Sequence, residues 1–162
     1  MTQAHIGVIG VGTMGSALAL NSAEKGQDVA LWNLELEAVD RLIASAGDLA
    51  TRLQRCEILI DMVAALPVPR SIVLMIPAGA PVDQTIAALR PLLSVGDTII
   101  DGGNSDFRDT MTRTKSLEAA GLSYLGIGVS GGAEGARRGP SMMVGGTGSS
   151  YNRVAPILEA IA

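Results

Sequence analysis

The stretch HIGVIGVGTMG, residues 5–15, decides the fold of this chain. Its first half is an apolar run of strand length, and its second half is the pattern Gly-x-Gly-x-x-Gly at residues 10–15. A glycine turn that directly follows a buried strand and opens a helix is typical of a dinucleotide-binding βαβ unit. The alternative interpretation is a tight turn with a structural role only.

Each glycine of this motif has its own chemical reason. Gly10 permits the tight turn, Gly12 lets the backbone approach a pyrophosphate, and Gly15 lets helix and strand pack closely. The helix that begins near Thr13 offers free N–H groups and the positive end of its dipole. The motif therefore predicts dinucleotide binding at the first turn of the chain.

Apolar runs of strand length alternate with amphipathic segments of helix length along the whole chain. Strands are predicted at residues 5–10, 28–33, 53–56, 71–76, 97–101, 122–127 and 141–144. Helices are predicted at residues 13–25, 35–46, 82–93, 106–120 and 149–160, with a further one ending before Pro67. A glycine-rich loop is predicted at residues 126–139. This alternation predicts a Rossmann-type α/β fold, a doubly wound, mainly parallel sheet with helices on both faces.

The composition narrows the function classes. The 162 residues fit one domain, and 48% hydrophobic with 17% charged residues exclude intrinsic disorder. A net charge of −4 argues against a nucleic-acid or anionic-membrane partner held by bulk charge. One cysteine, Cys56, and one histidine, His5, leave no internal disulfide, zinc cluster or triad, so we expect no metal and a reduced, cytoplasmic location. No secretory signal or membrane span is visible.

The end of the second strand selects the cofactor in this fold. An acidic side chain there binds the ribose hydroxyls of NAD, whereas an arginine receives the 2′-phosphate of NADP. This chain has Asn33-Leu34-Glu35 and no arginine at that point, so NAD is favoured over NADP. Glu35 has a second interpretation, because an acidic residue also stabilises the start of a helix.

Two further glycine clusters follow later strands. The first, Asp101-Gly102-Gly103-Asn104-Ser105, lies at a carboxyl strand end, where Asn104 offers a donor and an acceptor to substrate and nicotinamide. The alternative is a turn in which Asn104 caps the next helix, and both interpretations can hold together. Ser130, Gly131 and Gly132 form a cradle suited to a carboxylate or hydroxyls, and Arg137 with Arg138 suits an anionic substrate.

These clusters together resemble the 6-phosphogluconate dehydrogenase family, from residue 6 to residue 162. The resemblance is carried by GVGTMG at 10–15, PAG at 77–79, GDTIIDGGNS at 96–105, GVSGGAEGAR at 128–137 and GPSMMVGG at 139–146. The wider β-hydroxyacid dehydrogenases usually have a DxST-type segment in place of DGGN.

The resemblance implies oxidative decarboxylation of 6-phosphogluconate, a sugar-acid phosphate, to ribulose 5-phosphate in the pentose phosphate pathway, with hydride transfer to NAD or NADP. It implies that the cofactor contacts Gly10, Val11, Gly12, Thr13, Met14, Gly15, Asn33, Leu34, Glu35, Ile76, Pro77, Ala78 and Asn104. It implies that the substrate contacts Asn104, Ser130, Gly131 and Gly132.

Two departures bear on the cofactor. NADP-using members of the family commonly have Asn-Arg-Thr where this chain has Asn33-Leu34-Glu35, and they tend to carry lysine where Pro77 stands. Both departures weaken the expectation of NADP.

By the same resemblance, residues 1–162 are the dinucleotide-binding domain, and the general base Lys and the acid Glu lie beyond Ala162. A helical domain for catalysis and dimerisation is expected there, so the full-length protein is expected to be a homodimer or larger homo-oligomer and this chain alone inactive. Within the chain, Lys25 and Lys115 are interpreted as surface residues and Glu134 as structural, so no catalytic residue is expected here. Another β-hydroxyacid dehydrogenase, or a stand-alone dinucleotide-binding module without catalysis, is the alternative.

Overall fold

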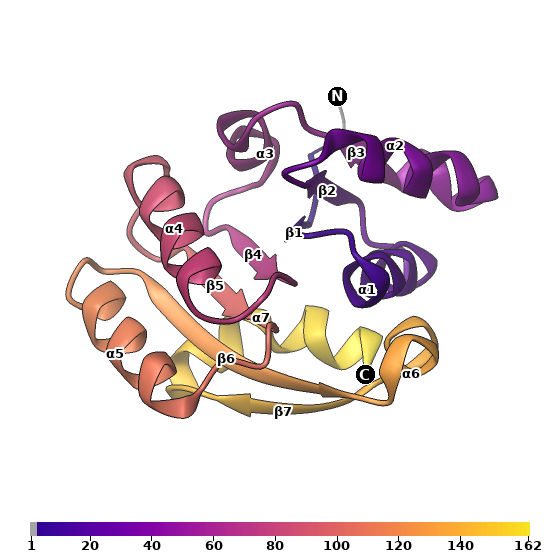
Figure 1. The fold of residues 1–162 in the computed structure, drawn as a ribbon. Helices are drawn as coiled ribbons and strands as arrows, with labels where there is room; N and C mark the ends of the chain where they lie inside the picture. Colours follow the sequence, from indigo (N-terminus) through magenta and orange to yellow (C-terminus); the bar gives the residue numbers. More distant parts are fainter. Residues whose placement is uncertain (1–2) are drawn as a thin grey trace.

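The computed structural model describes residues 3–162, which form one seven-stranded sheet with helices on both faces (Figure 1). The strands are β1 (Ile6–Ile9), β2 (Val29–Trp32), β3 (Leu53–Arg55), β4 (Ser71–Leu74), β5 (Thr98–Asp101), β6 (Ser123–Ser130) and β7 (Ser141–Gly145). The helices are α1 (Thr13–Glu24), α2 (Leu36–Ser45), α3 (Leu59–Ala65), α4 (Ala80–Leu89), α5 (Phe107–Glu118), α6 (Gly132–Arg138) and α7 (Gly148–Ile161). Two 3₁₀ turns, η1 (Gly47–Arg52) and η2 (Arg90–Leu92), complete the chain.

The strand order is β3-β2-β1-β4-β5-β6-β7. Strands β1 to β6 run parallel, and β7 pairs antiparallel with β6. Because β1 lies between β2 and β4, the chain reverses its direction of winding there, and such a switch point leaves a crevice at the carboxyl ends of the strands. The predicted Rossmann-type fold is confirmed.

The core has two apolar layers, one on each face of the sheet. Neighbouring residues of one strand alternate between them: Val8 packs in the layer under α1, α2 and α7, and Ile9 packs in the layer under α3, α4 and α5. Val73 and Leu74 of β4 repeat this alternation, and all four side chains are buried. A sheet covered on both faces needs apolar side chains at every position, which explains the unbroken aliphatic runs.

The predicted loop at residues 126–139 is wrong. Strand β6 continues to Ser130, and α6 follows almost at once. The glycines are used for close packing inside the strand: a Cβ on Gly126 would stand 2.8 Å from Cγ2 of Thr110 in α5, and one on Gly128 would stand 2.8 Å from Cε of Met143 in β7. Gly126 and Gly128 therefore lie within a strand, where close packing leaves no room for a side chain.

The predicted helix at residues 82–93 is shorter at its end than expected. Helix α4 covers Ala80–Leu89, and the chain then tightens into η2, which contains Pro91. Proline has no N–H to continue the helix ladder, so the helix ends just before it.

No helix within residues 3–162 has both the length and the apolar character to cross a bilayer.

Candidate dinucleotide site

The turn after β1 is a tight glycine turn with no room for side chains at two positions. Gly10 has φ +93°, and a Cβ on it would overlap the carbonyl oxygen of Met75 at the end of β4. A Cβ on Gly15 would overlap the carbonyl oxygen of Gly10, so α1 packs directly on the turn. These close approaches place the start of α1 at the switch point of the sheet.

The amino end of α1 is open to an anion. Its N-cap is Gly12, and among the described residues no side chain accepts a hydrogen bond from its first N–H groups. Its first turn carries no acidic residue, and a Cβ on Gly12 would meet no atom within 4 Å. Free N–H groups, a positive dipole end and open space fit a pyrophosphate.

Asn33 joins the first turn to the end of β2. The backbone N–H of Val11 donates to Oδ1 of Asn33 at 3.1 Å, and Nδ2 of Asn33 donates to the carbonyl oxygen of Glu35 at 3.0 Å. Leu34 lies between them with 86% of its surface exposed. Glu35 is the N-cap of α2 but makes no side-chain capping bond in the described part of the chain, so its carboxylate is not engaged at the helix start.

Two clefts open on either side of the β4 carboxyl end. The first, of about 480 Å³, is mostly apolar and includes Trp32, Leu34 and Thr85. Five of its lining residues are expected cofactor residues: Gly10, Asn33, Leu34, Ile76 and Pro77. Its position beside the end of β2 suits an adenosine moiety.

The second cleft, of about 420 Å³, is lined by Met14, Met75, Ile76, Gly102, Gly103, Asn104 and Val129. Ile76 belongs to both clefts, so they meet at the end of β4. The structure thus brings together Met14, Ile76 and Asn104, which the sequence places far apart. Ser130, Gly131 and Gly132 follow Val129 directly but do not line this cleft.

The backbone of Asn104 is held in the left-handed region, with φ +59°. Its side chain does not cap α5, because Oδ1 of Asp106 accepts the N–H of Arg108 at 2.8 Å and performs that function. The alternative interpretation of Asn104 as a helix cap is therefore wrong. Its amide is left exposed beside the second cleft.

A buried carboxylate holds the turn that carries Asn104. Asp101 ends β5 and accepts three hydrogen bonds: from the N–H of Gly103 at 3.0 Å, from Oγ of Ser105 at 2.5 Å and from the hydroxyl of Tyr124 at 2.6 Å. Burial, followed by this bond to Asp101, raises the pKa of Tyr124 far above its usual range. Tyr124 therefore stays a proton donor to Asp101 at every physiological pH.

The comparisons with known proteins agree with this geometry. A family model described as the NAD binding domain of 6-phosphogluconate dehydrogenase matches residues 5–162. The chain belongs to the 6-phosphogluconate dehydrogenase family.

Individual members of the 6-phosphogluconate dehydrogenase family are closely similar to this chain. A decarboxylating 6-phosphogluconate dehydrogenase of Bacillus licheniformis is 50% identical over 97% of this chain, and the NAD(+)-dependent decarboxylating enzyme of Bacillus subtilis is 48% identical over 97%. The solved 6-phosphogluconate dehydrogenase of Plasmodium falciparum superposes with a TM-score of 0.92 at 34% identity over 98% of this chain. The chain spans about a third of the length of these relatives: 33% of each Bacillus enzyme and 34% of the Plasmodium falciparum enzyme.

The third glycine cluster of this dehydrogenase domain begins helix α6. Gly131 is its N-cap with φ +118°, and Ser130, Gly131 and Gly132 are exposed at the carboxyl end of β6. The two arginines of this cluster are paired: Arg137 donates to Glu24 at 2.5 Å, and Arg138 forms an exposed pair with Glu134 at 2.5 Å. The interpretation of Glu134 as a structural residue is consistent with that pair.

Lys25 and Lys115, the predicted surface residues, and His5 lie away from the two clefts. Lys25 follows α1 and Lys115 occupies the last turn of α5, and both are exposed. A helix that follows a parallel strand returns toward the amino edge of the sheet, so both helix ends lie opposite the site. His5 accepts the N–H of Asp28 through Nδ1 at 2.8 Å, also before the strands begin.

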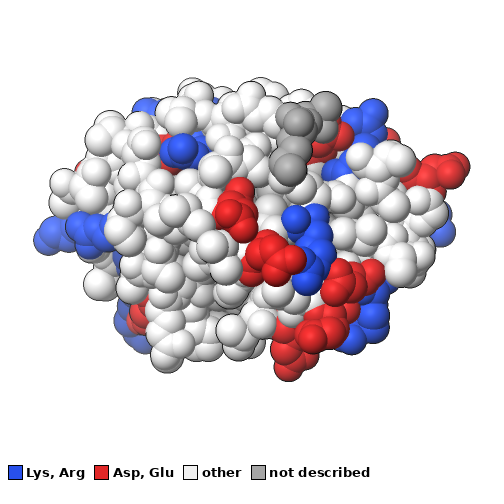
Figure 2. Space-filling model, turned by 90° about the horizontal axis from the view of Figure 1, so that it is seen from above, with Lys and Arg blue, Asp and Glu red and all other residues white. Residues whose placement is uncertain are grey.

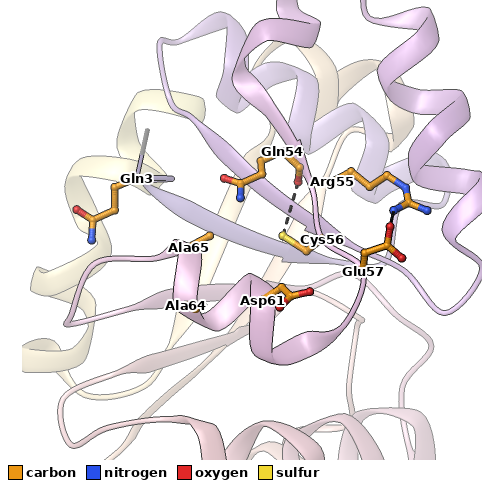
Figure 3. Close-up of a pocket in the computed structure, with 8 residues that line it drawn as sticks. All are labelled: Gln3, Gln54, Arg55, Cys56, Glu57, Asp61, Ala64 and Ala65. Carbon is orange, nitrogen blue, oxygen red and sulfur yellow. Dashed lines mark hydrogen bonds and ion pairs between the residues drawn. The ribbon is translucent and has the colours of Figure 1, made fainter. Parts of the chain in front are cut away.

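A third hollow, of about 630 Å³, lies between β3 and α3 (Figure 3). Cys56 is 98% shielded there, and its Sγ lies 3.9 Å from the carbonyl oxygen of Gln54. Burial raises the pKa of the Cys56 thiol from 9.0 to about 11. A neutral, buried thiol is a poor nucleophile, so this hollow lacks the chemistry of a cysteine site.

The surface over this edge carries charges of both signs side by side (Figure 2). Arg55, for example, pairs with Asp40 at 2.6 Å and also with Glu57.

Across residues 3–162, no group of three or more His, Cys, Asp and Glu side chains could hold a metal ion.

Sequence reasoning assigned no role to Asp101, to its partner Tyr124 or to Arg113, whose Nη1 lies 3.7 Å from Oδ2 of Asp101. A buried aspartate at the end of an otherwise aliphatic strand was a readable signal for Asp101, because a buried carboxylate needs partners. Arg113 lies among polar residues of α5 and gives no such signal.

Proposed function

We propose that this chain binds NAD across the carboxyl ends of its parallel strands, as the cofactor domain of a 6-phosphogluconate dehydrogenase that oxidises and decarboxylates 6-phosphogluconate. The observation that carries the proposal is the uncapped, acid-free start of α1 at the open position of Gly12, between two clefts. The similarity to decarboxylating family members at 48–50% identity supports the reaction class. NAD bound at this edge of the sheet would supply the nicotinamide ring that accepts the hydride.

Three groups of residues are proposed to contact three parts of the cofactor: the pyrophosphate, the adenosine and the nicotinamide. Residues 10–15 hold the pyrophosphate through the N–H groups at the start of α1. The apolar cleft beside Leu34 and Pro77 takes the adenosine, and Ile76, which lines both clefts, contacts the cofactor between its two halves. Ala78 is also proposed to contact the cofactor, although it lines neither cleft. Met14 and Asn104 then face the nicotinamide end.

NAD is proposed over NADP on the chemistry at the end of β2. Neither Leu34 nor Glu35 can neutralise a 2′-phosphate, whereas the free carboxylate of Glu35 can accept hydrogen bonds from ribose hydroxyls. The NAD(+)-dependent relative from Bacillus subtilis supports this choice.

The substrate is proposed to be 6-phosphogluconate, held by Asn104 and by Ser130 with the N–H groups of Gly131 and Gly132. All four are exposed at or just after the carboxyl ends of two neighbouring strands, β5 and β6. The proton-transferring lysine and glutamate are proposed to lie outside residues 1–162, in a protein that forms a homo-oligomer in the cytoplasm. The family resemblance supports these last points.

Calorimetric titration of the chain with NAD, NADP and ADP-ribose tests the cofactor assignment. We expect one site per chain, with NAD and ADP-ribose bound more tightly than NADP. The intact protein that carries this domain should then produce NADH from 6-phosphogluconate and release CO₂. Equal affinity for NAD and NADP would contradict the cofactor preference, and absence of NADH production by the intact protein would contradict the reaction.

A further inference from the structure

Strand β5 has a buried aspartate paired with an arginine at each end. Asp97 precedes the strand, and its Oδ2 lies 2.9 Å from Nη1 of Arg70. Asp101 ends the strand, and its Oδ2 lies 3.7 Å from Nη1 of Arg113. Both aspartate side chains are at most 1% exposed. The two pairs differ in location, because only Asp101 lies at the carboxyl edge with the clefts.

The guanidinium of Arg113 reaches two different loops. Its Nη2 donates to the carbonyl oxygen of Gly79 at 3.2 Å, and its Nε donates to Oδ1 of Asp83 at 2.8 Å, both at the junction of β4 and α4. Its Nη1 donates to Oγ of Ser105 at 3.2 Å, in the turn after β5. Arg113 is 7% exposed, so these bonds form largely away from water.

The two loops that Arg113 joins are also packed directly against each other. A Cβ on Gly103 would overlap the carbonyl oxygen of Ile76, so the backbones touch without an intervening side chain. Ile76 from the first loop and Asn104 from the second both line the second cleft. A change in the spacing of the loops therefore changes the shape of that cleft.

We propose that Arg113 is a positioning residue, which clamps residues 76–79 to residues 102–105 and so fixes the cleft between Ile76 and Asn104 for the nicotinamide half of the dinucleotide. This inference rests on the proposed function. Arg113 does not line the cleft, so it acts through Ser105, Asp101 and the backbone of Gly79. Its planar fork joins the loops through three separate nitrogen atoms, whereas a lysine carries its three N–H donors on one nitrogen.

The experiment compares Arg113→Lys with Arg70→Lys, a matched control. Arg70 is likewise a largely shielded arginine, 16% exposed, on a buried aspartate, but it contacts Val63, Ser94 and Asp97 at the amino ends of the strands. Calorimetry gives the affinities of each variant for NAD and for ADP-ribose, which lacks the nicotinamide. Denaturant unfolding gives each variant's stability.

For Arg113→Lys we expect the NAD affinity to fall about tenfold, and the ADP-ribose affinity to change by less than about twofold. Arg70→Lys should leave the ratio of the two affinities unchanged, even where it destabilises the fold as much. An unchanged ratio in folded Arg113→Lys, alongside normal NAD binding by the parent chain, overturns the clamp. Failure of the parent chain to bind NAD overturns the proposed function instead.

A second variant covers a failure of Arg113→Lys to fold. Asp83 is 62% exposed and bonds to Nε of Arg113, so Asp83→Asn weakens the clamp from the solvent side. We expect the NAD affinity to fall about threefold, with the ADP-ribose affinity unchanged, because the neutral amide holds the guanidinium less firmly. An unchanged ratio in Asp83→Asn, with Arg113→Lys unfolded, also overturns the clamp.

Discussion

The N–H of Val11 donates a 3.1 Å hydrogen bond to the side-chain oxygen of Asn33, which ties the glycine turn after β1 to the end of β2. The same amide group of Asn33 bonds onward to the carbonyl oxygen of Glu35. One side chain therefore sets the distance between the phosphate and ribose parts of the proposed site.

Replacing Asn33 by alanine should weaken both the fold and the site. The N–H of Val11 loses its partner, which we expect to lower the free energy of unfolding by about 1 kcal/mol. The NAD affinity should fall as well, because the turn after β1 is no longer held at its distance from β2. Urea unfolding and calorimetry measure the two effects. Asn33→Asp keeps an acceptor for Val11 and should lose less stability than alanine does.

Gly12→Ala should separate binding from stability. A Cβ at Gly12 enters open space, so the free energy of unfolding should change by less than about 0.5 kcal/mol. The methyl group occupies the space proposed for the pyrophosphate, so the NAD affinity should fall at least about tenfold. Gly148→Ala is the matched control, because Gly148 also has open space around it but begins α7. Equal NAD affinity in the two variants would refute the pyrophosphate assignment.

Leu34→Arg should shift cofactor preference toward NADP. Leu34 is 86% exposed, so the substitution should leave stability within about 0.5 kcal/mol of the parent. A guanidinium at this position can pair with a 2′-phosphate, and we expect the NADP affinity to rise about fivefold with little change for NAD. Calorimetry with both nucleotides checks this. A parent chain that already prefers NADP would contradict the argument.

Stability should fall in alkaline solution in a way that depends on Cys56. Its pKa is raised from 9.0 to about 11 in the folded chain, chiefly by burial and then by Asp61. A raised pKa contributes stability that is complete below pH 9 and is lost as the pH rises toward 11, because the unfolded chain releases the proton first. The contribution lost by pH 11 is about 2 kcal/mol. Unfolding measured from pH 8 to 11 should show a steeper fall for the parent than for Cys56→Ala, and parallel curves would contradict the burial argument.

The βαβ start, the mainly parallel sheet and its two-sided covering could be predicted, because they depend on local patterns: aliphatic runs, helix periodicity and a glycine turn. The region after Gly126 could not, because glycine was taken as a loop signal. In the structure Gly126 and Gly128 are strand residues. The side chains of Thr110 in α5 and Met143 in β7 pack closely against them, and that packing is visible only in three dimensions.

The candidate site shows the same division. Gly10, Gly12 and Gly15 could be assigned from spacing alone, since the turn geometry is local. The link from Arg113 to Gly79 and Ser105 could not, because it joins residues 34 and 8 positions apart through side chains on separate elements. Likewise, the role of Asn33 as the acceptor for Val11 depends on the pairing of β1 with β2.

The most direct test of the account is a map of backbone amide NMR shifts during titration of the chain with NAD. We expect the largest changes at residues 10–15, 33–35, 76–78 and 102–104, the turns that surround the two clefts. Changes confined to the hollow of Gln54, Cys56 and Asp61, or no changes at saturating NAD, would contradict the assignment of this strand edge as the dinucleotide site.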